Sequence, residues 1–378
     1  MRIGVKYESY DHASALLWCL HDARVVTEYS QFGAPREGSQ EYVTQEVTSD
    51  EKTFCCEING NTFFFSKNYD RLAAAECDMK INIVSEEPNG TDPRFNTELC
   101  IFPDIIRSTL SDDSLLDYMD RGNICFSAST VDFEHKNFIF CPLFGVIFFY
   151  YRLGLNYNNY YQAPKLCKHL VGMYHRVAHV GGGIHPTRNY IYERSAQILG
   201  PELSIFNRPK TDMASLLESY RYFGLWMLNH SVSYTDYATC VCNIIYETFD
   251  DEDTWVALNR TTLTEKTTKA IIFSEEKIFF IWYGPKHFAR HLIDYGFWCL
   301  NFEFLNTSQS PIRNIKESVF YAISYLKSLK ADLGSNVAVY GYLLGKYGDK
   351  LRENARLFKQ LEDQCPQKDA FLELITNG

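Results

Sequence analysis

Between residues 170 and 283, short apolar runs alternate with longer amphipathic stretches, and this alternation constrains the fold more than any other feature of the chain. Each short run has the length of a buried strand, and each longer stretch has the apolar periodicity of a helix. The expected strands cover 170–174, 203–206, 224–228, 241–245 and 278–283, and the expected helices cover 188–198, 213–220 and 265–273. A regular strand–helix–strand order predicts a parallel sheet with helices on both faces, because parallel strands need crossover connections.

The residues before this region predict a second α/β part. Asn59-Gly60 separates two apolar runs and is a strong signal for a β-hairpin. The expected elements are strands at 2–7, 54–57, 62–66, 81–84, 99–102 and 124–127, a helix at 13–20 and a loop at 30–50. Together they predict an alternating α/β region that contains at least one antiparallel pair.

A change in composition near residue 153 marks the expected boundary between two domains. The stretch that follows is rich in Asn and Tyr and ends at Pro164, as is typical of a linker. We therefore expect an N-terminal acceptor-side α/β domain over 1–153 and a C-terminal Rossmann-like domain over 154–345. The remaining segment, 346–378, contains a helix that is a candidate to pack back on the first domain.

Composition restricts the class of protein. A chain that is 46% hydrophobic and 15% aromatic is not intrinsically disordered. A formal charge of −10 argues against a generic nucleic-acid binder, whose affinity comes from a cationic surface. The 12 cysteines include no Cys-x-x-Cys pair and several sit in apolar runs, which indicates a reducing cytoplasm. The start of the chain does not read as a signal peptide, and the longest uncharged run, 137–151, is too short to span a bilayer.

The residues that open the expected helix at 265–273 are of the types that bind an anion. Thr264 suits the position of a helix N-cap, and Glu265 suits the positive end of the helix dipole. Lys266 and Lys269 share a similar face and add positive charge. Unsatisfied N–H groups at a helix start that follows a strand form a natural anion site. An ordinary capped helix with a Glu265–Lys269 surface pair accounts for the same residues, so spacing alone leaves both interpretations open.

The order of motifs around this helix resembles the donor-site region of GT-B glycosyltransferases. The pattern is a Glu-Thr after a strand, a Thr-Glu-Lys-Thr helix start and a Gly-Pro after the next strand. The matching residues are Glu247-Thr248, Thr264 to Thr267, Gly284-Pro285, Leu292 and Gly296-Phe297. The whole pattern is similar to that of viral and bacterial glycosyltransferase-like proteins, and distantly to that of α-1,3-fucosyltransferases. Those proteins also carry an Arg that opens the first helix of the second domain, where this chain has Arg188.

This resemblance, which spans about half of the chain, implies a GT-B-like fold with two Rossmann-like domains facing across a cleft. It also implies transfer of a hexosyl or pentosyl group from a nucleotide sugar to an acceptor hydroxyl. Lys266 and Arg188 would neutralise the diphosphate beside Thr264 and Lys269, and Glu265 would bind the ribose. Glu247 is a further donor-side candidate, although a polar residue that merely ends a strand fits it equally well.

The implied co-substrate is a UDP- or GDP-sugar, with no bound cofactor and no obligatory metal. The chain departs from the family pattern at residues 274–277, where a segment of small residues and Pro is usual and this chain has neither Gly nor Pro. The identity of the sugar therefore stays open.

The general base and the acceptor are less constrained. In two-domain transferases of this kind the acceptor lies at the ends of the N-terminal strands, where Glu8, Asp11 and His12 are candidates to accept the proton of the attacking hydroxyl. A second candidate cluster lies at 132–135. The resemblance to viral glycosyltransferase-like proteins implies one candidate acceptor, a hydroxymethylated pyrimidine in viral DNA. The alternatives are a glycan, lipid or protein acceptor, and a non-catalytic binding module that keeps the fold.

Two other features have simpler interpretations. The acidic residues 250–253 are compatible with an Asp-x-Asp metal motif but are more typical of a solvated loop. The three glycines at 181–183 are not followed by the Lys-Ser/Thr of a phosphate-binding P-loop, so they predict a turn.

Overall fold

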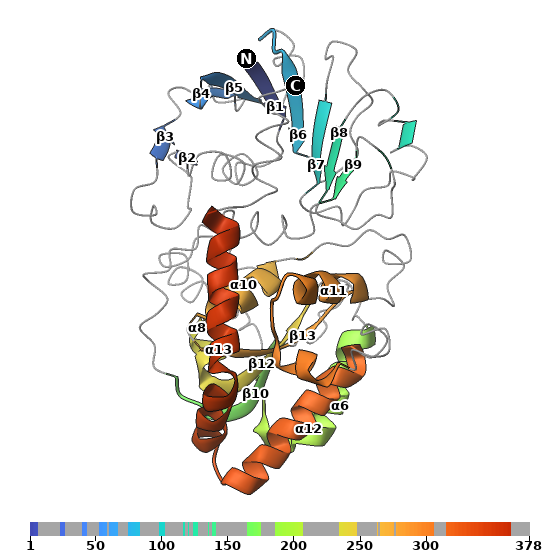
Figure 1. Ribbon diagram of the computed structural model, residues 1–378, viewed down its shortest axis with the longest axis vertical. Helices are drawn as coiled ribbons and strands as arrows, with labels where there is room; N and C mark the ends of the chain where they lie inside the picture. Colours follow the sequence, from blue (N-terminus) through green and yellow to red (C-terminus); the bar gives the residue numbers. More distant parts are fainter. Residues whose placement is uncertain are drawn as a thin grey trace, which may run out of the picture. The chain divides into compact units, whose positions relative to one another are not determined.

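The fold was analysed in a computed structural model, which describes residues 1–6, 23–26, 40–43, 53–58, 60–66, 75–83, 98–102, 116–117, 120, 124–127, 135, 138–140, 165–174, 186–206, 234–247, 263, 265–275, 277–305 and 315–363. The chain is a mixed α/β protein with two compact units (Figure 1). The first unit comprises Met1–Leu155, Ala257–Thr264 and Leu361–Gly378, and the second comprises Asn156–Val256 and Glu265–Gln360.

The first unit contains a seven-stranded sheet in the order β4-β5-β1-β6-β7-β8-β9. Its strands are β1 (Arg2–Lys6), β4 (Phe54–Ile58), β5 (Asn61–Ser66), β6 (Met79–Ile83), β7 (Glu98–Phe102), β8 (Ile124–Ser127) and β9 (Phe138–Phe140). β4 and β5 are antiparallel and the other neighbours are parallel. The hairpin predicted at Asn59-Gly60 is confirmed, and Gly60 has the positive φ, 77°, that such a turn requires.

A separate parallel pair, β2 (Ala23–Val26) and β3 (Gln40–Val43), corrects one prediction. The polar stretch 30–50 was expected to be a loop throughout, but β3 runs through it. Tyr42 and Val43 are good strand formers, and they pair with Val25 and Val26 of β2. The Gly, Pro and polar residues around them concealed this short strand.

The second unit contains a four-stranded, all-parallel sheet in the order β11-β10-β12-β13. Its strands are β10 (His169–Tyr174), β11 (Leu203–Phe206), β12 (Cys240–Tyr246) and β13 (Phe279–Tyr283), and helices α6 (Pro186–Leu199) and α10 (Glu265–Phe273) connect them. Every residue of β12 and β13 is buried, as is typical of parallel strands covered on both faces. The predicted parallel sheet is confirmed, and α10 has the predicted bounds.

The direction of the crossovers decides where the helices lie. The chain steps from β10 to β11 in one direction and from β12 to β13 in the other. Because parallel crossovers are right-handed, these steps place α6 and α10 on opposite faces of the sheet. The direction in which successive strands are added to the sheet reverses between β10 and β12.

The remaining elements of the second unit pack around this sheet. They are η1 (Gly200–Glu202), α8 (Tyr234–Thr239), α11 (Lys286–Asp294), η2 (Leu300–Phe304), α12 (Ile315–Leu333) and α13 (Asn336–Asp363), of which residues 361–363 belong to the first unit. Ser335 caps α13, since its Oγ accepts the backbone N–H of Ala338 at 3.2 Å. α13 therefore begins ahead of the expected boundary between residues 345 and 346 and continues through it.

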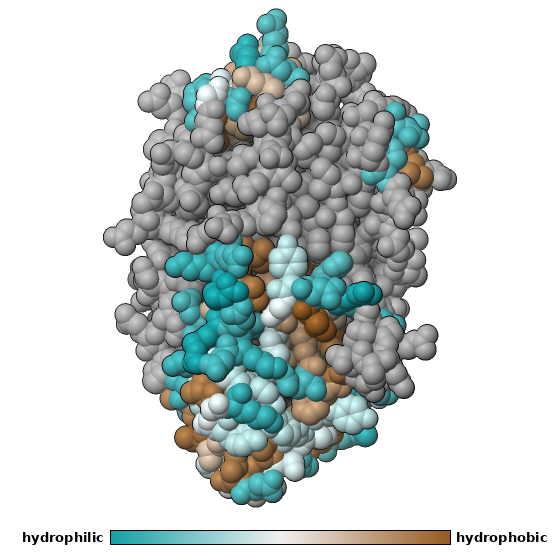
Figure 2. Space-filling view, in the orientation of Figure 1, coloured by the Kyte–Doolittle hydropathy of each residue, from teal (hydrophilic) through white to brown (hydrophobic). Residues whose placement is uncertain are grey.

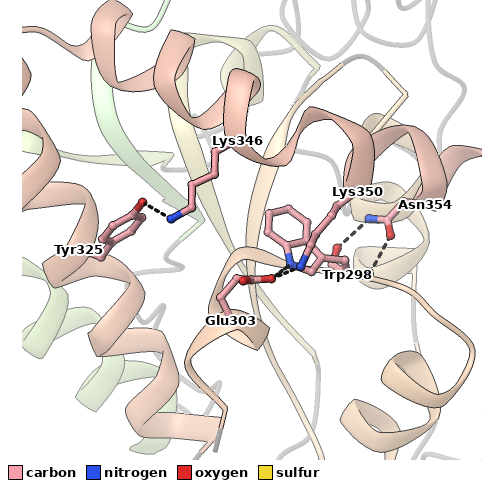
Figure 3. A network of polar contacts seen from close by, with 6 residues as sticks. All are labelled: Trp298, Glu303, Tyr325, Lys346, Lys350 and Asn354. Carbon is pink, nitrogen blue, oxygen red and sulfur yellow. Dashed lines mark hydrogen bonds and ion pairs between the residues drawn. The ribbon is translucent and has the colours of Figure 1, made fainter.

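Two buried asparagines fix chain segments by pairing with backbone groups. Asn354 of α13 accepts the backbone N–H of Trp298 at 2.7 Å and donates to its carbonyl at 2.7 Å (Figure 3). Nearby, Glu303 accepts the indole Nε1 of Trp298 at 2.6 Å and pairs with Lys350. Asn301 makes the same two backbone contacts with Trp282, so its amide extends the β13 ladder.

Hydrophilic and hydrophobic residues are mixed on the visible surface of the second unit (Figure 2). The large hydrophobic side chains that are exposed in the described part of the chain are Leu166, Tyr190, Tyr321, Leu333, Val337 and Tyr342. None of the helices that the structure describes combines the length and the apolar character needed to cross a membrane.

Candidate functional site

Three neighbouring strands of the second unit end at the same edge of the sheet, and each is followed along the chain by a helix. β10 precedes α6, β12 precedes α10, and β13 precedes α11. Helix starts carry unsatisfied N–H groups and the positive end of the helix dipole. Because the strand order reverses between β10 and β12, this carboxyl edge also contains the topological switch point, where open α/β sheets bind their ligands.

Glu247, directly after β12, joins these helices to the sheet. Its backbone N–H donates to the carbonyl of Tyr283 at 2.8 Å, which continues the pairing of β12 with β13. Its carbonyl accepts Nη2 of Arg188, from the first turn of α6, at 2.9 Å. Its buried Oε1 accepts the backbone N–H of Thr267, from α10, at 3.3 Å, and also the Thr267 hydroxyl. The end of β12 therefore holds the starts of both helices.

Trp282 and Gly284 complete the packing around Glu247. The indole Nε1 of Trp282 donates to Oγ1 of Thr267 at 2.7 Å, so indole, hydroxyl and carboxylate form one chain of hydrogen bonds. A Cβ atom at Gly284 would lie 2.6 Å from the Trp282 ring and 3.0 Å from Cβ of Glu247. Only glycine fits without displacement, and the start of α11 follows directly after this close approach.

Arg188 brings a positive charge to the carboxyl edge. Its hydrogen bond to the Glu247 carbonyl holds the guanidinium at the end of β12. Tyr246, the last residue of β12, is buried, and its hydroxyl donates to Sδ of Met173 at 3.9 Å. Burial raises the pKa of Tyr246 well above its usual value, with Arg188 acting in the opposite direction. Tyr246 is therefore a neutral neighbour of the arginine at ordinary pH.

The structure brings together two of the predicted donor-site residues, Arg188 and Glu247. Lys266 lies in the first turn of α10, next to Thr267, and is partly exposed. Glu265 and Lys269 also belong to α10, but their side chains lie outside the described residues, as does the whole of Thr264.

Most other sequence-based candidates lie outside the described residues. This holds for the general-base candidates Glu8, Asp11 and His12, for the acidic residues 250–253 and for the glycines 181–183. Of the second candidate cluster, His135 is described, and its Nε2 lies 3.3 Å from Oδ1 of Asp120. Within the described ranges, no group of three or more His, Cys, Asp or Glu side chains is arranged to hold a metal ion.

Two site residues were missed as functional candidates from the sequence. Thr267 belongs to the Thr-Glu-Lys-Thr pattern, but within this pattern the resemblance implies roles only for Thr264, Glu265 and Lys266. Trp282 was treated as strand core, and no sequence signal marks its bond to Thr267.

Residues 274–277, which contain neither Gly nor Pro, connect α10 to β13. Lys277 adopts the left-handed conformation with φ 60°, and its N–H donates to the carbonyl of Ser274 at 3.0 Å. The chain therefore turns from α10 into β13 without a glycine or proline.

The chain was compared with protein-family models, with curated proteins and with solved structures. No protein-family model, no curated protein and no solved structure matches the chain.

Proposed function

We propose that the protein is a glycosyltransferase that uses a nucleotide sugar and binds the donor diphosphate at the carboxyl edge of the four-stranded sheet. The observation that carries the proposal is the convergence of Arg188 from α6 and Thr267 from α10 on Glu247. This convergence lies at the switch point between β10 and β12, the position at which sheets of this kind bind nucleotides. In this proposal the two compact units correspond to the two domains of a GT-B enzyme.

Each described residue has a distinct task in the proposed reaction. An acceptor hydroxyl attacks the anomeric carbon, the bond from that carbon to the diphosphate breaks, and the nucleoside diphosphate leaves with the bonding electrons. Arg188 and Lys266 stabilise the negative charge that develops on the leaving group, because fixed charges act strongly where charge accumulates. Glu247 is a positioning residue, since its carbonyl holds Arg188 and its carboxylate holds the turn that carries Lys266.

The resemblance to GT-B enzymes adds a role for Glu265, which would accept hydrogen bonds from the donor ribose. The acceptor is specified here only as a hydroxyl group, and its proton goes to a general base for which Glu8, Asp11 and His12 are the sequence candidates.

A donor panel tests the proposal. The full chain is incubated with UDP-, GDP-, dTDP- and CMP-sugars, binding is measured by calorimetry, and slow hydrolysis is followed by release of the free nucleotide. We expect at least one donor to bind and to be hydrolysed in the absence of acceptor. Binding without hydrolysis, and without transfer to glycan, protein or hydroxymethylated DNA, would instead identify a non-catalytic module. If none of the donors binds, both the transferase proposal and the non-catalytic module are ruled out.

A further inference from the structure

Lys165 lies at the amino edge of the four-stranded sheet, opposite the edge that carries the candidate site. It precedes β10, and the backbone N–H of the next residue, Leu166, donates to the carbonyl of Ala238 in α8 at 2.9 Å. Its Nζ donates to the carbonyl of Tyr237 at 3.4 Å and lies 5.3 Å from the centre of the Tyr340 ring of α13. The segment before β10, helix α8 and helix α13 therefore fix the place of this amine.

The surroundings of the Lys165 amine do not suit a charge. An ammonium group has three donors, and the described contacts of Lys165 are one long hydrogen bond and an aromatic face. No carboxylate forms an ion pair with it in the part of the chain that the structure describes. The titratable groups that act on it there are the thiols of Cys167, Cys240 and Cys242. Because removing a charge from water is costly without a charged partner, the uncharged amine is favoured here.

Burial has opposite effects on the reactivity of this amine and of the neighbouring thiols. It lowers the pKa of Lys165 to about 8, so about half of the amine is uncharged at that pH. It raises the pKa of Cys167 and of Cys242, so these thiols stay protonated near neutral pH. An uncharged amine is a nucleophile, whereas a protonated thiol is a poor one. Lys165 is therefore the nucleophilic group of this cluster.

The products that an amine can form differ in charge, and the surroundings of Lys165 select among them. Carbon dioxide would convert the amine into a negatively charged carbamate, and an aldehyde would form an imine that is commonly protonated. Both products keep a charge where none is compensated. An acyl group instead gives a neutral amide, which keeps one N–H for the carbonyl of Tyr237. The surroundings therefore favour acylation.

We propose that Lys165 is a modification site that is acylated by acyl thioesters. The lone pair of Nζ attacks the thioester carbonyl carbon, the carbon–sulfur bond breaks, and the bonding electrons leave with sulfur. The nitrogen loses one proton, the sulfur leaves as a thiol, and an amide remains on Lys165. The side chain is partly exposed, which gives a small acyl donor access to it. This inference does not depend on the transferase proposal, because the residue lies outside the carboxyl edge.

The rate of acylation at single lysines tests the proposal. The full chain is incubated at pH 8 with S-acetyl-N-acetylcysteamine, a short thioester, and acetylation of each lysine is followed by peptide mass spectrometry. Lys168, an exposed lysine of the same segment, is the control. An ordinary lysine is less than about 1% uncharged at this pH, so we expect Lys165 to react at least about tenfold faster than Lys168. In concentrated urea the two rates should become equal.

Equal rates in the folded protein would overturn the proposal. So would an advantage of Lys165 that persists in urea, because it would come from the local sequence and not from the folded surroundings.

The melting temperature provides a second test that does not depend on access of the reagent. Lys165→Gln carries a neutral amide, whereas Lys165→Arg keeps the positive charge. We expect Lys165→Gln to melt at least about 3 °C higher than Lys165→Arg at pH 7. Acetylation of Lys165 in the wild-type protein should raise the melting temperature in the same direction. A melting temperature of Lys165→Gln at or below that of Lys165→Arg would contradict the preference for an amide.

Discussion

Thr267 donates its backbone N–H and its hydroxyl to the same carboxylate oxygen of Glu247, at the point where β12 leaves the sheet. The same hydroxyl accepts the indole Nε1 of Trp282 at 2.7 Å, so it is both donor and acceptor. One threonine therefore determines where the first turn of α10, and with it Lys266, stands relative to the sheet.

Replacement of this hydroxyl should destabilise the protein. Thr267→Val keeps the shape of the side chain but leaves the Glu247 carboxylate with one donor fewer and Trp282 Nε1 without its acceptor, both in a buried setting. We expect the free energy of unfolding in urea to fall by about 2–3 kcal/mol. Thr267→Ser restores the hydroxyl and should recover most of the loss. A Val variant as stable as the Ser variant would contradict the hydrogen-bond chain.

Substitution of Gly284 tests the close approach of the chain to Trp282 and Glu247, with Gly345 as a matched control. In Gly284→Ala the new methyl group would lie 2.6 Å from the Trp282 ring and 3.0 Å from Cβ of Glu247, so the packing must shift. We expect a loss of about 1–3 kcal/mol in thermal or urea unfolding. Gly345→Ala places the same methyl group on α13 with no atom within 4 Å, and should stabilise the protein by up to about 1 kcal/mol. Similar effects for the two substitutions would refute the close approach at Gly284.

Lys165 should make the stability depend on alkaline pH. Its Nζ donates to the carbonyl of Tyr237 at 3.4 Å and lies 5.3 Å from the centre of the Tyr340 ring. Burial lowers the pKa of Lys165 to about 8. The unfolded chain, with an ordinary lysine pKa of about 10.4, therefore binds more protons between these two values. Since stability rises with pH wherever the unfolded state binds more protons, Lys165 contributes a rise across this window.

The comparison with Lys165→Met isolates this contribution. We expect the variant to be more stable than wild type at pH 7 by about 2–3 kcal/mol, and the difference to shrink as pH increases from 8 towards 10. Buried thiols such as Cys242 give the opposite slope in both proteins, since burial raises the Cys242 pKa while Lys165 acts to lower it. Urea unfolding at a series of pH values measures the difference. A gap that does not change with pH would show that Lys165 keeps an ordinary pKa.

The sequence predicted the elements of the second unit more fully than it predicted the contacts between them. Apolar runs bounded by turn residues located β10 to β13, and the Thr-Glu-Lys pattern located the start of α10. α8 was missed because its six residues are too few to show a helical period. The turn before β13 depends on a positive φ at Lys277, and the residues around Lys277 do not predict this conformation.

The sequence predicted some residues of the candidate site but not the contacts between them, and the reason is physical. Arg188 and Lys266 were found by residue type and by position in a motif. The partners of Glu247 depend on the register that places Tyr246 opposite Tyr283, since this register aligns the end of β12 with the end of β13. Register is a property of the assembled sheet, so neither the bond from Thr267 nor the one from Trp282 followed from local patterns.

Lys266 provides the direct test of the donor site. Lys266→Ala removes a partly exposed side chain from the first turn of α10, so the unfolding free energy should change by less than about 1 kcal/mol. Turnover of the donor sugar should fall at least about a hundredfold, because loss of one group that stabilises developing charge costs several kcal/mol of barrier. Lys277→Ala, at the other end of the helix–strand connection, is the matched control and should keep full activity. Initial rates of nucleotide release at saturating donor measure both variants. Full activity of Lys266→Ala would remove Lys266 from the donor site, whatever nucleotide the protein binds.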